Sequence, residues 1–183
     1  PFNFKKTAGG SSGGAAAAVQ SKLIPFADGS DMMGSLRTPS SFCETFSIRP
    51  TPGLVPSNST LSYKMPRIST NGVIARHPMD LALMLDGCIG KKACFEKLIR
   101  NKFSLRKVTA CIPENYLENI LVDNKVTKQF YQNIETFKKL GVKIKKINFD
   151  FEPNLFWESW IDLRSKIISL NLKKEFEENS HLL

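Results

Sequence analysis

The spacing of apolar and polar residues differs between the first third of the chain and the remainder. Over residues 1–60 glycine, serine and alanine are concentrated, which indicates close backbone packing or a ligand held against the main chain. Successive alanines within 15–20 favour a short helix that follows a glycine-rich loop. The apolar runs 22–27 and 46–48 favour short strands, and proline and glycine close the second.

The middle of the chain alternates between turn residues and one regular apolar pattern. Polar and turn residues prevail over 56–70, which predicts a surface loop. Residues 78–90 predict a helix, because Pro78 suits a first helical turn, apolar side chains recur on one face and a glycine can end it. Residues 91–104 predict a basic connector.

The last third of the chain contains a strand–helix–strand pattern. Residues 107–112 favour a strand, and apolar side chains recur at helical spacing over 123–140. Gly141 is a natural helix stop, and alternating apolar residues after it favour a second strand. A crossover of this kind implies parallel strands with helices packed over the sheet. The pattern therefore predicts an α/β fold.

A further amphipathic helix is predicted over 156–172. Trp157, Trp160, Ile161 and Ile168 recur at helical spacing, and we expect them to pack in a core or groove and not to form a cofactor box.

Charge distribution and the length of the apolar runs argue against a nucleic-acid-binding protein and against a membrane-spanning one. The chain has 183 residues, and 26 Lys plus Arg against 17 Asp plus Glu give a formal charge of +9. Basic residues are scattered among acidic ones and lysine outnumbers arginine, so we expect a solvated basic surface and no nucleic-acid partner. No apolar run approaches the roughly 20 residues that cross a bilayer, so we expect no membrane span.

Four cysteines, Cys43, Cys88, Cys94 and Cys111, match no zinc-site spacing, and the chain has two histidines. The four cysteines are too sparse for a disulfide framework, so we expect reduced thiols and a cytoplasmic location. We also expect no metal and no cofactor.

Two serine-containing loops are the candidates for chemistry, at 9–14 and 29–37. Neither loop has the Gly-Lys-Ser/Thr ending of a P-loop or the GxGxxG motif of a dinucleotide-binding turn. His77 is the one histidine in the middle part of the sequence, so a GxSxG nucleophile elbow with its Ser-His-Asp triad is not expected. A serine nucleophile without histidine needs another base, such as a neutral lysine, and a second serine hydroxyl can bridge the two. Small residues around it leave backbone N–H groups free for an oxyanion.

Short motifs lie at 7–14, 15–18, 29–31, 34–37, Pro39, 42–43, 49–50, 53–56, 72–76 and 80–85. Their order and spacing closely resemble the amidase signature family of Ser-Ser-Lys hydrolases. The resemblance is strong over residues 1–90 and loose beyond. It implies a mixed, twisted β-sheet sandwiched by helices, and it implies that residues 1–183 are an internal part of one larger domain, with a signature core over 1–90 and a βαβ and helical part over 105–183.

The resemblance implies a role for each matching residue. Ser35 would be the acylated nucleophile, and Ser11 would be the bridging serine, preceded by a cis peptide bond from Gly10. The backbone amides of four residues would form the oxyanion hole: Met32, Met33, Gly34 and Ser35 itself. Three further residues would support the two loops: Ser12, Asp31 and Arg37.

The sequence also departs from the family pattern. Met33 stands where glycine is common, so its φ and ψ must be allowed for its amide to serve, and its side chain would narrow the acyl pocket. Glu44 occupies another position where glycine is more usual. The family's catalytic lysine belongs to a segment upstream of residue 1, and Lys5, Lys6 and Lys22 do not match its motif. We therefore expect this polypeptide to have little activity in isolation.

The leading interpretation is an amidase that hydrolyses a small-molecule carboxylic amide through an acyl-enzyme. A second is the glutamine-hydrolysing subunit of a tRNA-dependent amidotransferase, for which the basic charge is mild support and Met32 and Met33 are the less typical feature. A third is a noncatalytic binding module on the same scaffold. A homodimer remains open in each case.

Overall fold

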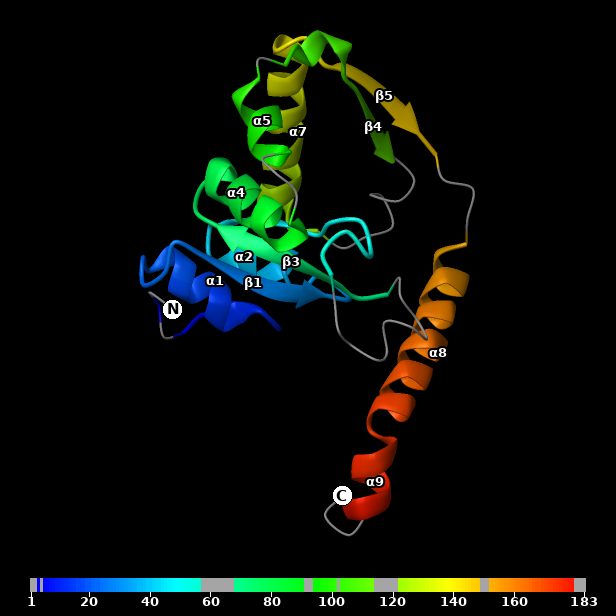
Figure 1. The fold of residues 1–183 in the computed structure, drawn as a ribbon. Helices are drawn as coiled ribbons and strands as arrows, with labels where there is room; N and C mark the ends of the chain where they lie inside the picture. The colour runs from blue at the N-terminus through cyan, green and yellow to red at the C-terminus, as the bar shows by residue number, and fades with distance from the viewer. Residues whose placement is uncertain are drawn as a thin grey trace. The chain divides into compact units, whose positions relative to one another are not determined.

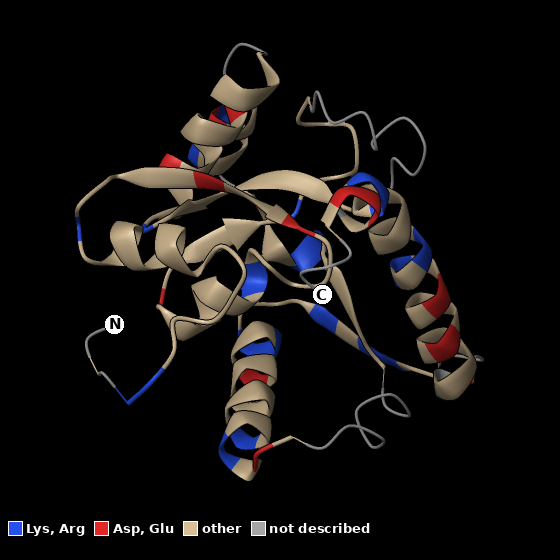
Figure 2. Ribbon diagram, turned by 90° about the horizontal axis from the view of Figure 1, so that it is seen from below, with Lys and Arg blue, Asp and Glu red and all other residues tan. Residues whose placement is uncertain are grey.

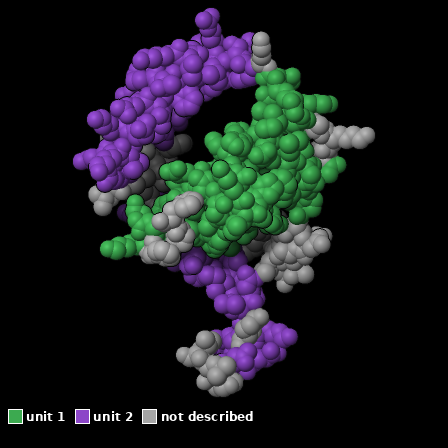
Figure 3. Space-filling view, turned by 90° about the vertical axis from the view of Figure 1, so that its left-hand side faces the viewer, with its two compact units in different colours: residues 1–102 green, residues 103–183 purple. Residues whose placement is uncertain are grey.

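The computed structural model describes residues 3, 5–56, 68–90, 94–101, 103–113, 122–148 and 152–179 (Figure 1). The chain divides into two compact units, Pro1–Lys102 and Phe103–Leu183, which Figure 3 draws in separate colours. Each is described by itself. The mixed α/β class expected from the sequence is confirmed, since both units combine strands with helices. The loop predicted over 56–70 lies largely outside the described residues.

The first unit contains a three-stranded antiparallel sheet with β3 at its centre. Strand β3 (Thr70–Ala75) pairs with β1 (Phe26–Asp31) on one side and β2 (Phe46–Ile48) on the other. Every residue of β3 except Asn71 is buried. Gly72 is required here, because a Cβ on it would lie 2.2 Å from the Ile48 carbonyl oxygen.

Helices cover both faces of this sheet (Figure 1). Helix α1 (Gly13–Gln20) packs on β1 and β3, and α4 (Pro78–Ile89) packs on the opposite face. A third helix, α2 (Arg37–Phe42), contacts α1 and β2. The core beneath α1 consists of small and medium apolar side chains, Ala16, Val19, Ala27, Leu36 and Ile74.

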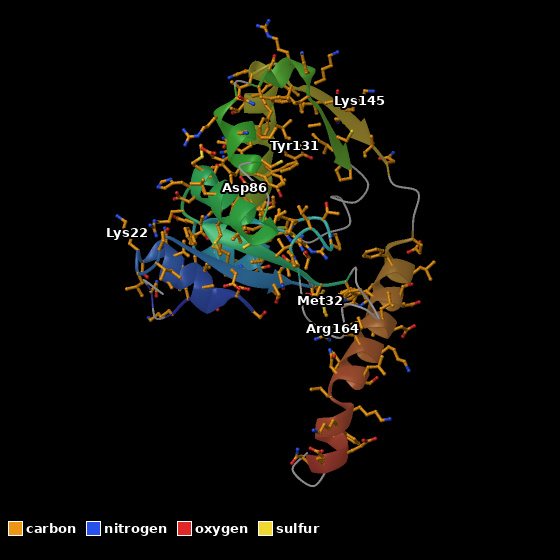
Figure 4. All side chains as sticks on the ribbon, viewed as in Figure 1. Lys22, Met32, Asp86, Tyr131, Lys145 and Arg164 are labelled. Carbon is orange, nitrogen blue, oxygen red and sulfur yellow. The ribbon has the colours of Figure 1, made fainter. Side chains whose placement is uncertain are left out.

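The residues predicted as a basic connector include a short helix, α5 (Phe95–Arg100), so that prediction was incomplete. The buried carboxylate of Asp86 in α4 accepts hydrogen bonds from the N–H groups of Phe95 and Glu96 at the start of α5 (Asp86 is labelled in Figure 4). The hydrogen bond from Phe95, opposed by desolvation and assisted by Glu96, holds the pKa of Asp86 below its usual range. The Asp86 carboxylate of α4 therefore caps the N-terminus of α5.

The strand predicted over 22–27 is wrong in its first four residues. The N–H of Lys22 donates to the Val19 carbonyl and that of Leu23 donates to the Ala18 carbonyl, so residues 21–23 close the end of α1. Lys22 has a φ of +64°, the left-handed conformation usual at this position after a helix. Strand β1 begins only at Phe26.

The second unit contains the predicted parallel βαβ arrangement. Strand β4 (Thr109–Pro113) pairs in parallel with β5 (Lys143–Ile147), and Ala110 lies opposite Ile144. A one-turn 3₁₀ helix, η1 (Leu105–Lys107), precedes β4. Helix α7 (Asn124–Lys139) connects the strands, and Gly141, with a φ of +94°, closes it. The predicted helix, its stop and the second strand are thus confirmed.

Two helices follow, α8 (Pro153–Asn171) and α9 (Lys173–Asn179). The predicted helix is confirmed, although it begins at Pro153, three residues before the predicted start. The predicted packing is wrong for Trp157, which is 54% exposed, and for Ile161 and Ile168, which are also exposed, whereas Trp160 is half-buried. Ile167 is the buried apolar residue of this helix among those described. Apolar spacing located the helix but not the surface against which its large side chains pack. Within the described ranges no helix combines the length and apolar character needed to cross a membrane.

Candidate functional site

The structure brings the two serine loops side by side. The N–H of Ser12, in the loop that leads into α1, donates to the Ser35 carbonyl oxygen at 3.1 Å. The hydroxyl of Ser12 donates to the Ser30 carbonyl oxygen at 3.5 Å. Ser11 is exposed and Ser35 is half-buried, and the peptide bond between Gly10 and Ser11 is cis, as the resemblance implies. Two serines 24 positions apart in sequence therefore lie on adjacent loops.

Glycines make this close approach of the loops achievable. A Cβ on Gly29 in β1 would lie 2.6 Å from the Ser12 hydroxyl oxygen. Gly9 has a φ of +75°, and a Cβ on it would lie 3.3 Å from Phe42 Cδ2 and from the Pro39 backbone. The prediction that the small residues of this region reflect close backbone packing is confirmed.

The turn that carries Ser35 folds around the buried carboxylate of Asp31, the last residue of β1. Oδ1 accepts hydrogen bonds from the Gly34 N–H at 2.8 Å and from Arg37 Nη2 at 3.0 Å. Oδ2 accepts from the Leu36 N–H at 3.2 Å and from Arg37 Nε at 3.0 Å. These four bonds determine the course of the chain on both sides of Ser35.

The same contacts decide the charge of Asp31. Burial alone would raise its pKa, but the hydrogen bond from Arg37 and those from the backbone N–H groups of Gly34 and Leu36 outweigh burial. The pKa of Asp31 is consequently held well below its usual range. Asp31 is therefore held as an anion at the centre of the turn.

The backbone of the turn presents amides that could bind a developing oxyanion. Neither Met32 nor Met33 has a positive φ. The backbone conformation at Met33, where glycine is common in the family, is therefore one that methionine adopts without strain. Gly34 has a φ of +102° and donates its N–H to Asp31, which removes that amide from the four predicted donors. Among the described residues, no backbone or side-chain atom accepts a hydrogen bond from the N–H groups of Met32, Met33 and Ser35.

The structure also explains Glu44, which the sequence left without an interpretation. Glu44 has a φ of +56° and directly follows the last turn of α2, where the N–H of Thr45 donates to the Ser40 carbonyl. Glycine is favoured at such a helix end because it adopts positive φ without steric cost.

The three lysines weighed from the sequence, Lys5, Lys6 and Lys22, are all exposed. Lys22 lies at the opposite end of β1 from Met32 (Figure 4). The described residues contain no group of three His, Cys, Asp or Glu side chains placed to hold a metal ion. A groove of about 880 Å³ beside α1 is lined by Lys6, Ala17, Leu23 and Phe42 among others, but not by Ser11 or Ser35.

One contact to the turn was missed by sequence reasoning. Arg49 follows β2, and its Nε donates to the Asp31 carbonyl oxygen at 3.2 Å. Its Nη2 donates to the carbonyl oxygen of Ile68, just before β3, at 2.9 Å. Arg49 occurs in a recognised motif, yet its acceptors are backbone carbonyls, which leave no mark in a sequence.

Outside this region the basic residues are interspersed with acidic ones (Figure 2). Several are paired on exposed helix faces, as are Lys138 with Glu135 and Lys173 with Glu177. The expectation of a solvated basic surface remains a prediction.

Comparison with known proteins places this geometry in a family. The amidase family matches residues 1–169 of the chain. A glutamyl-tRNA(Gln) amidotransferase subunit of Protochlamydia amoebophila (strain UWE25) is 34% identical over 158 residues, covering 81% of this chain and 32% of that protein. The chain thus spans about a third of the length of the curated relatives that it matches.

Solved structures agree with this assignment. The crystal structure of an amidase superimposes with a TM-score of 0.78 at 23% identity, covering 95% of this chain and 38% of that one. The structure of 6-aminohexanoate cyclic dimer hydrolase, complexed with substrate, gives a TM-score of 0.66 at 26% identity, covering 80% and 33%. With its ordered motifs, its adjacent serine loops and a family match over most of its length, the chain belongs to the amidase signature family.

Proposed function

We propose that the protein containing this chain hydrolyses the C–N bond of a carboxylic amide, with Ser35 as the nucleophile. The observation that carries the proposal is the hydrogen bond from the Ser12 N–H to the Ser35 carbonyl, because it joins the two loops that the family uses for catalysis. Both units of the chain are then parts of one catalytic domain.

The reaction follows from the groups on these loops. Ser11 accepts the proton of Ser35 while passing its own to a lysine supplied by a part of the protein outside these residues. Ser35 Oγ attacks the amide carbonyl carbon, and the oxyanion that forms accepts hydrogen bonds from the amides of Met32, Met33 and Ser35. Return of a proton through Ser11 to the nitrogen releases the amine, and water then hydrolyses the acyl-enzyme.

Labelling with a fluorophosphonate tests the assignment of the nucleophile. In the complete protein, we expect the reagent to label the wild type and not Ser35→Ala. Ser41→Ala, which removes an exposed hydroxyl from α2, is the matched control and should be labelled like the wild type. Labelling that survives in Ser35→Ala would show that the assignment is wrong.

A second candidate function is glutamine hydrolysis within a tRNA-dependent amidotransferase. It is favoured by the curated relatives named as glutamyl-tRNA(Gln) amidotransferase subunits, at 30% to 34% identity. Ammonia release from glutamine should then require charged tRNA together with a partner protein. A stand-alone amidase should turn over small amides without either, and Met32 and Met33 favour that outcome. A noncatalytic module would show neither activity and would lack a lysine in the matching upstream segment.

Location and assembly complete the proposal. The cysteines Cys43, Cys88, Cys94 and Cys111 are free thiols, which is consistent with a reducing cytoplasm. A small-molecule amide is the expected substrate, and size-exclusion chromatography with light scattering would decide between a monomer and a homodimer.

A further inference from the structure

A single guanidinium, that of Arg49, joins three segments behind the Ser35 turn. Its Nε donates to the carbonyl oxygen of Asp31 at the end of β1, and its Nη2 donates to the carbonyl oxygen of Ile68 just before β3. The Arg49 side chain is 30% exposed, so water screens it only in part. The planar fork of arginine can hold two acceptors in fixed directions at once.

We propose that Arg49 is a positioning residue that aims the oxyanion-hole amide of Met32; the proposal rests on the function proposed above. The Asp31 carbonyl and the Met32 N–H belong to the same planar peptide unit. In a trans peptide these two groups point in opposite directions, so holding the oxygen also fixes the direction of the N–H. Arg49 therefore orients an amide that it does not contact.

The charge of Arg49 also favours hydrogen bonding by the Met32 N–H to an oxyanion. A cationic donor on a peptide oxygen polarises that peptide and strengthens the N–H on its other side. Arg49 Nε also lies 3.6 Å from Asp31 Oδ1, so the carboxylate faces a second cation besides Arg37. Two cations beside one carboxylate reduce the repulsion that Asp31 would otherwise exert on an oxyanion forming at the same turn.

The chain offers a matched control in Arg76. Its Nη1 donates to the carbonyl oxygens of Val19, within α1, and Ile24, before β1. Arg76 is also half-buried and also joins segments through two backbone carbonyls, but neither carbonyl belongs to the Ser35 turn. Loss of Arg76 should therefore reproduce the structural part of losing Arg49 without the part that concerns the oxyanion.

The test compares Arg49→Gln and Arg76→Gln in the complete protein. We expect both variants to lower the urea midpoint of unfolding by similar amounts. Arg49→Gln alone should lower kcat for amide hydrolysis, by about tenfold or more, with KM within about twofold of the wild-type value. Arg49→Lys, which keeps the charge but not the fork, should recover part of kcat and serves as the second variant if Arg49→Gln does not fold. Equal kcat values for Arg49→Gln and the wild type, or an equal loss in Arg76→Gln, would overturn the proposal.

Hydrogen exchange separates this proposal from the proposed function. Peptides spanning residues 31–36 should exchange faster in Arg49→Gln than in Arg76→Gln, whether or not the protein is active. If Ser35→Ala hydrolyses the amide as fast as the wild type, the proposed function fails, and the exchange result alone then decides whether Arg49 orders the turn. Unchanged exchange over 31–36 in Arg49→Gln would contradict that ordering.

Discussion

The two units of the chain differ in how many apolar residues they bury, since nine of the twelve buried hydrophobic residues among those described belong to the first unit. In the first, small and medium side chains such as Val19 and Ile74 are fully buried in the core between α1 and the sheet. In the second, large side chains such as Trp157 and Phe137 remain about half exposed. Catalytic loops need positions accurate to fractions of an ångström, which a dense core and buried ionic contacts can provide. The serine loops belong to the unit that contains this core.

The ends of four helices allow a second comparison. In the first unit, α1 and α2 are followed by Lys22 and Glu44 in the left-handed conformation, where each side chain carries a steric cost. In the second unit, α7 is followed by Gly141, which adopts the same conformation freely. Helix α4, also in the first unit, ends at Gly90 with a φ of +71°, so the steric cost is specific to the ends of α1 and α2.

The largest effect should come from adding one methyl group to the dense unit. In Gly72→Ala, the new Cβ would meet the Ile48 carbonyl and Leu36 Cδ1, at 2.2 Å and 2.7 Å in the present backbone. Because one of these neighbours is backbone, we expect a loss of about 3 kcal/mol or more of unfolding free energy. Urea unfolding of the complete protein measures it. A loss below about 1 kcal/mol would show that the sheet is less tightly packed than described.

Removal of the charge from Asp31 should have the next largest effect. Asp31→Asn leaves Arg37 without its anion and should lower stability by about 2 to 4 kcal/mol at neutral pH. The folded-state pKa of Asp31 lies below its unfolded value of about 4. Its stabilisation is therefore present above pH 4 and is lost as the pH falls further.

Unfolding measured against pH distinguishes this account from a simple loss of packing. The difference in stability between wild type and Asp31→Asn should shrink below pH 4, because the unfolded wild type then binds a proton at Asp31 that the folded protein binds only at lower pH. A difference that stays constant down to pH 2 would contradict the ionic role of Asp31.

Exchanging helix-end residues should give smaller effects of opposite sign in the two units. Lys22→Gly removes a side chain from a left-handed residue and should stabilise the protein by about 0.5 to 1 kcal/mol. Gly141→Ala adds one, and its Cβ would lie 2.7 Å from Arg106 Cγ, so it should destabilise by about 1 kcal/mol. Thermal unfolding of both variants provides the check. Effects of the same sign would mean that left-handed backbone is not the cause.

The smallest effect is expected on the exposed face of α8. Trp157→Ser should change the free energy of unfolding by no more than about 0.5 kcal/mol. Ile167→Ala, in the same helix but at a buried position, should cost about 2 kcal/mol or more. Urea unfolding of the two variants side by side gives the comparison. A larger loss in Trp157→Ser would show that the complete protein buries this face.

Much of the fold followed from local patterns, and the failures share a cause. The course of α7 could be predicted because Asp123, whose carboxylate accepts the Lys125 N–H, and Gly141 mark its ends. Strand β3 was not predicted, since Asn71 and Gly72 interrupt its apolar run and its pairing partners are distant in sequence.

The same limit applies to the site. Motif order predicted that Ser11 and Ser35 belong together, and it identified Asp31 and Arg37. It predicted Gly34 as an amide donor to substrate, whereas the structure commits that N–H to Asp31. It gave no role to Arg49, whose contacts are backbone carbonyls supplied by the three-dimensional fold.

The central claim is that Ser35 is the residue acylated by substrate, and peptide mapping of the trapped acyl-enzyme tests it most directly. Trypsin should release Ser35 in peptide 23–37 and Ser11 in peptide 7–22. After rapid acid quench of the complete protein with a slowly deacylated ester or amide, we expect the acyl mass on peptide 23–37, and its loss in Ser35→Ala. An acyl group on peptide 7–22, or one that persists on 23–37 in Ser35→Ala, would contradict the account.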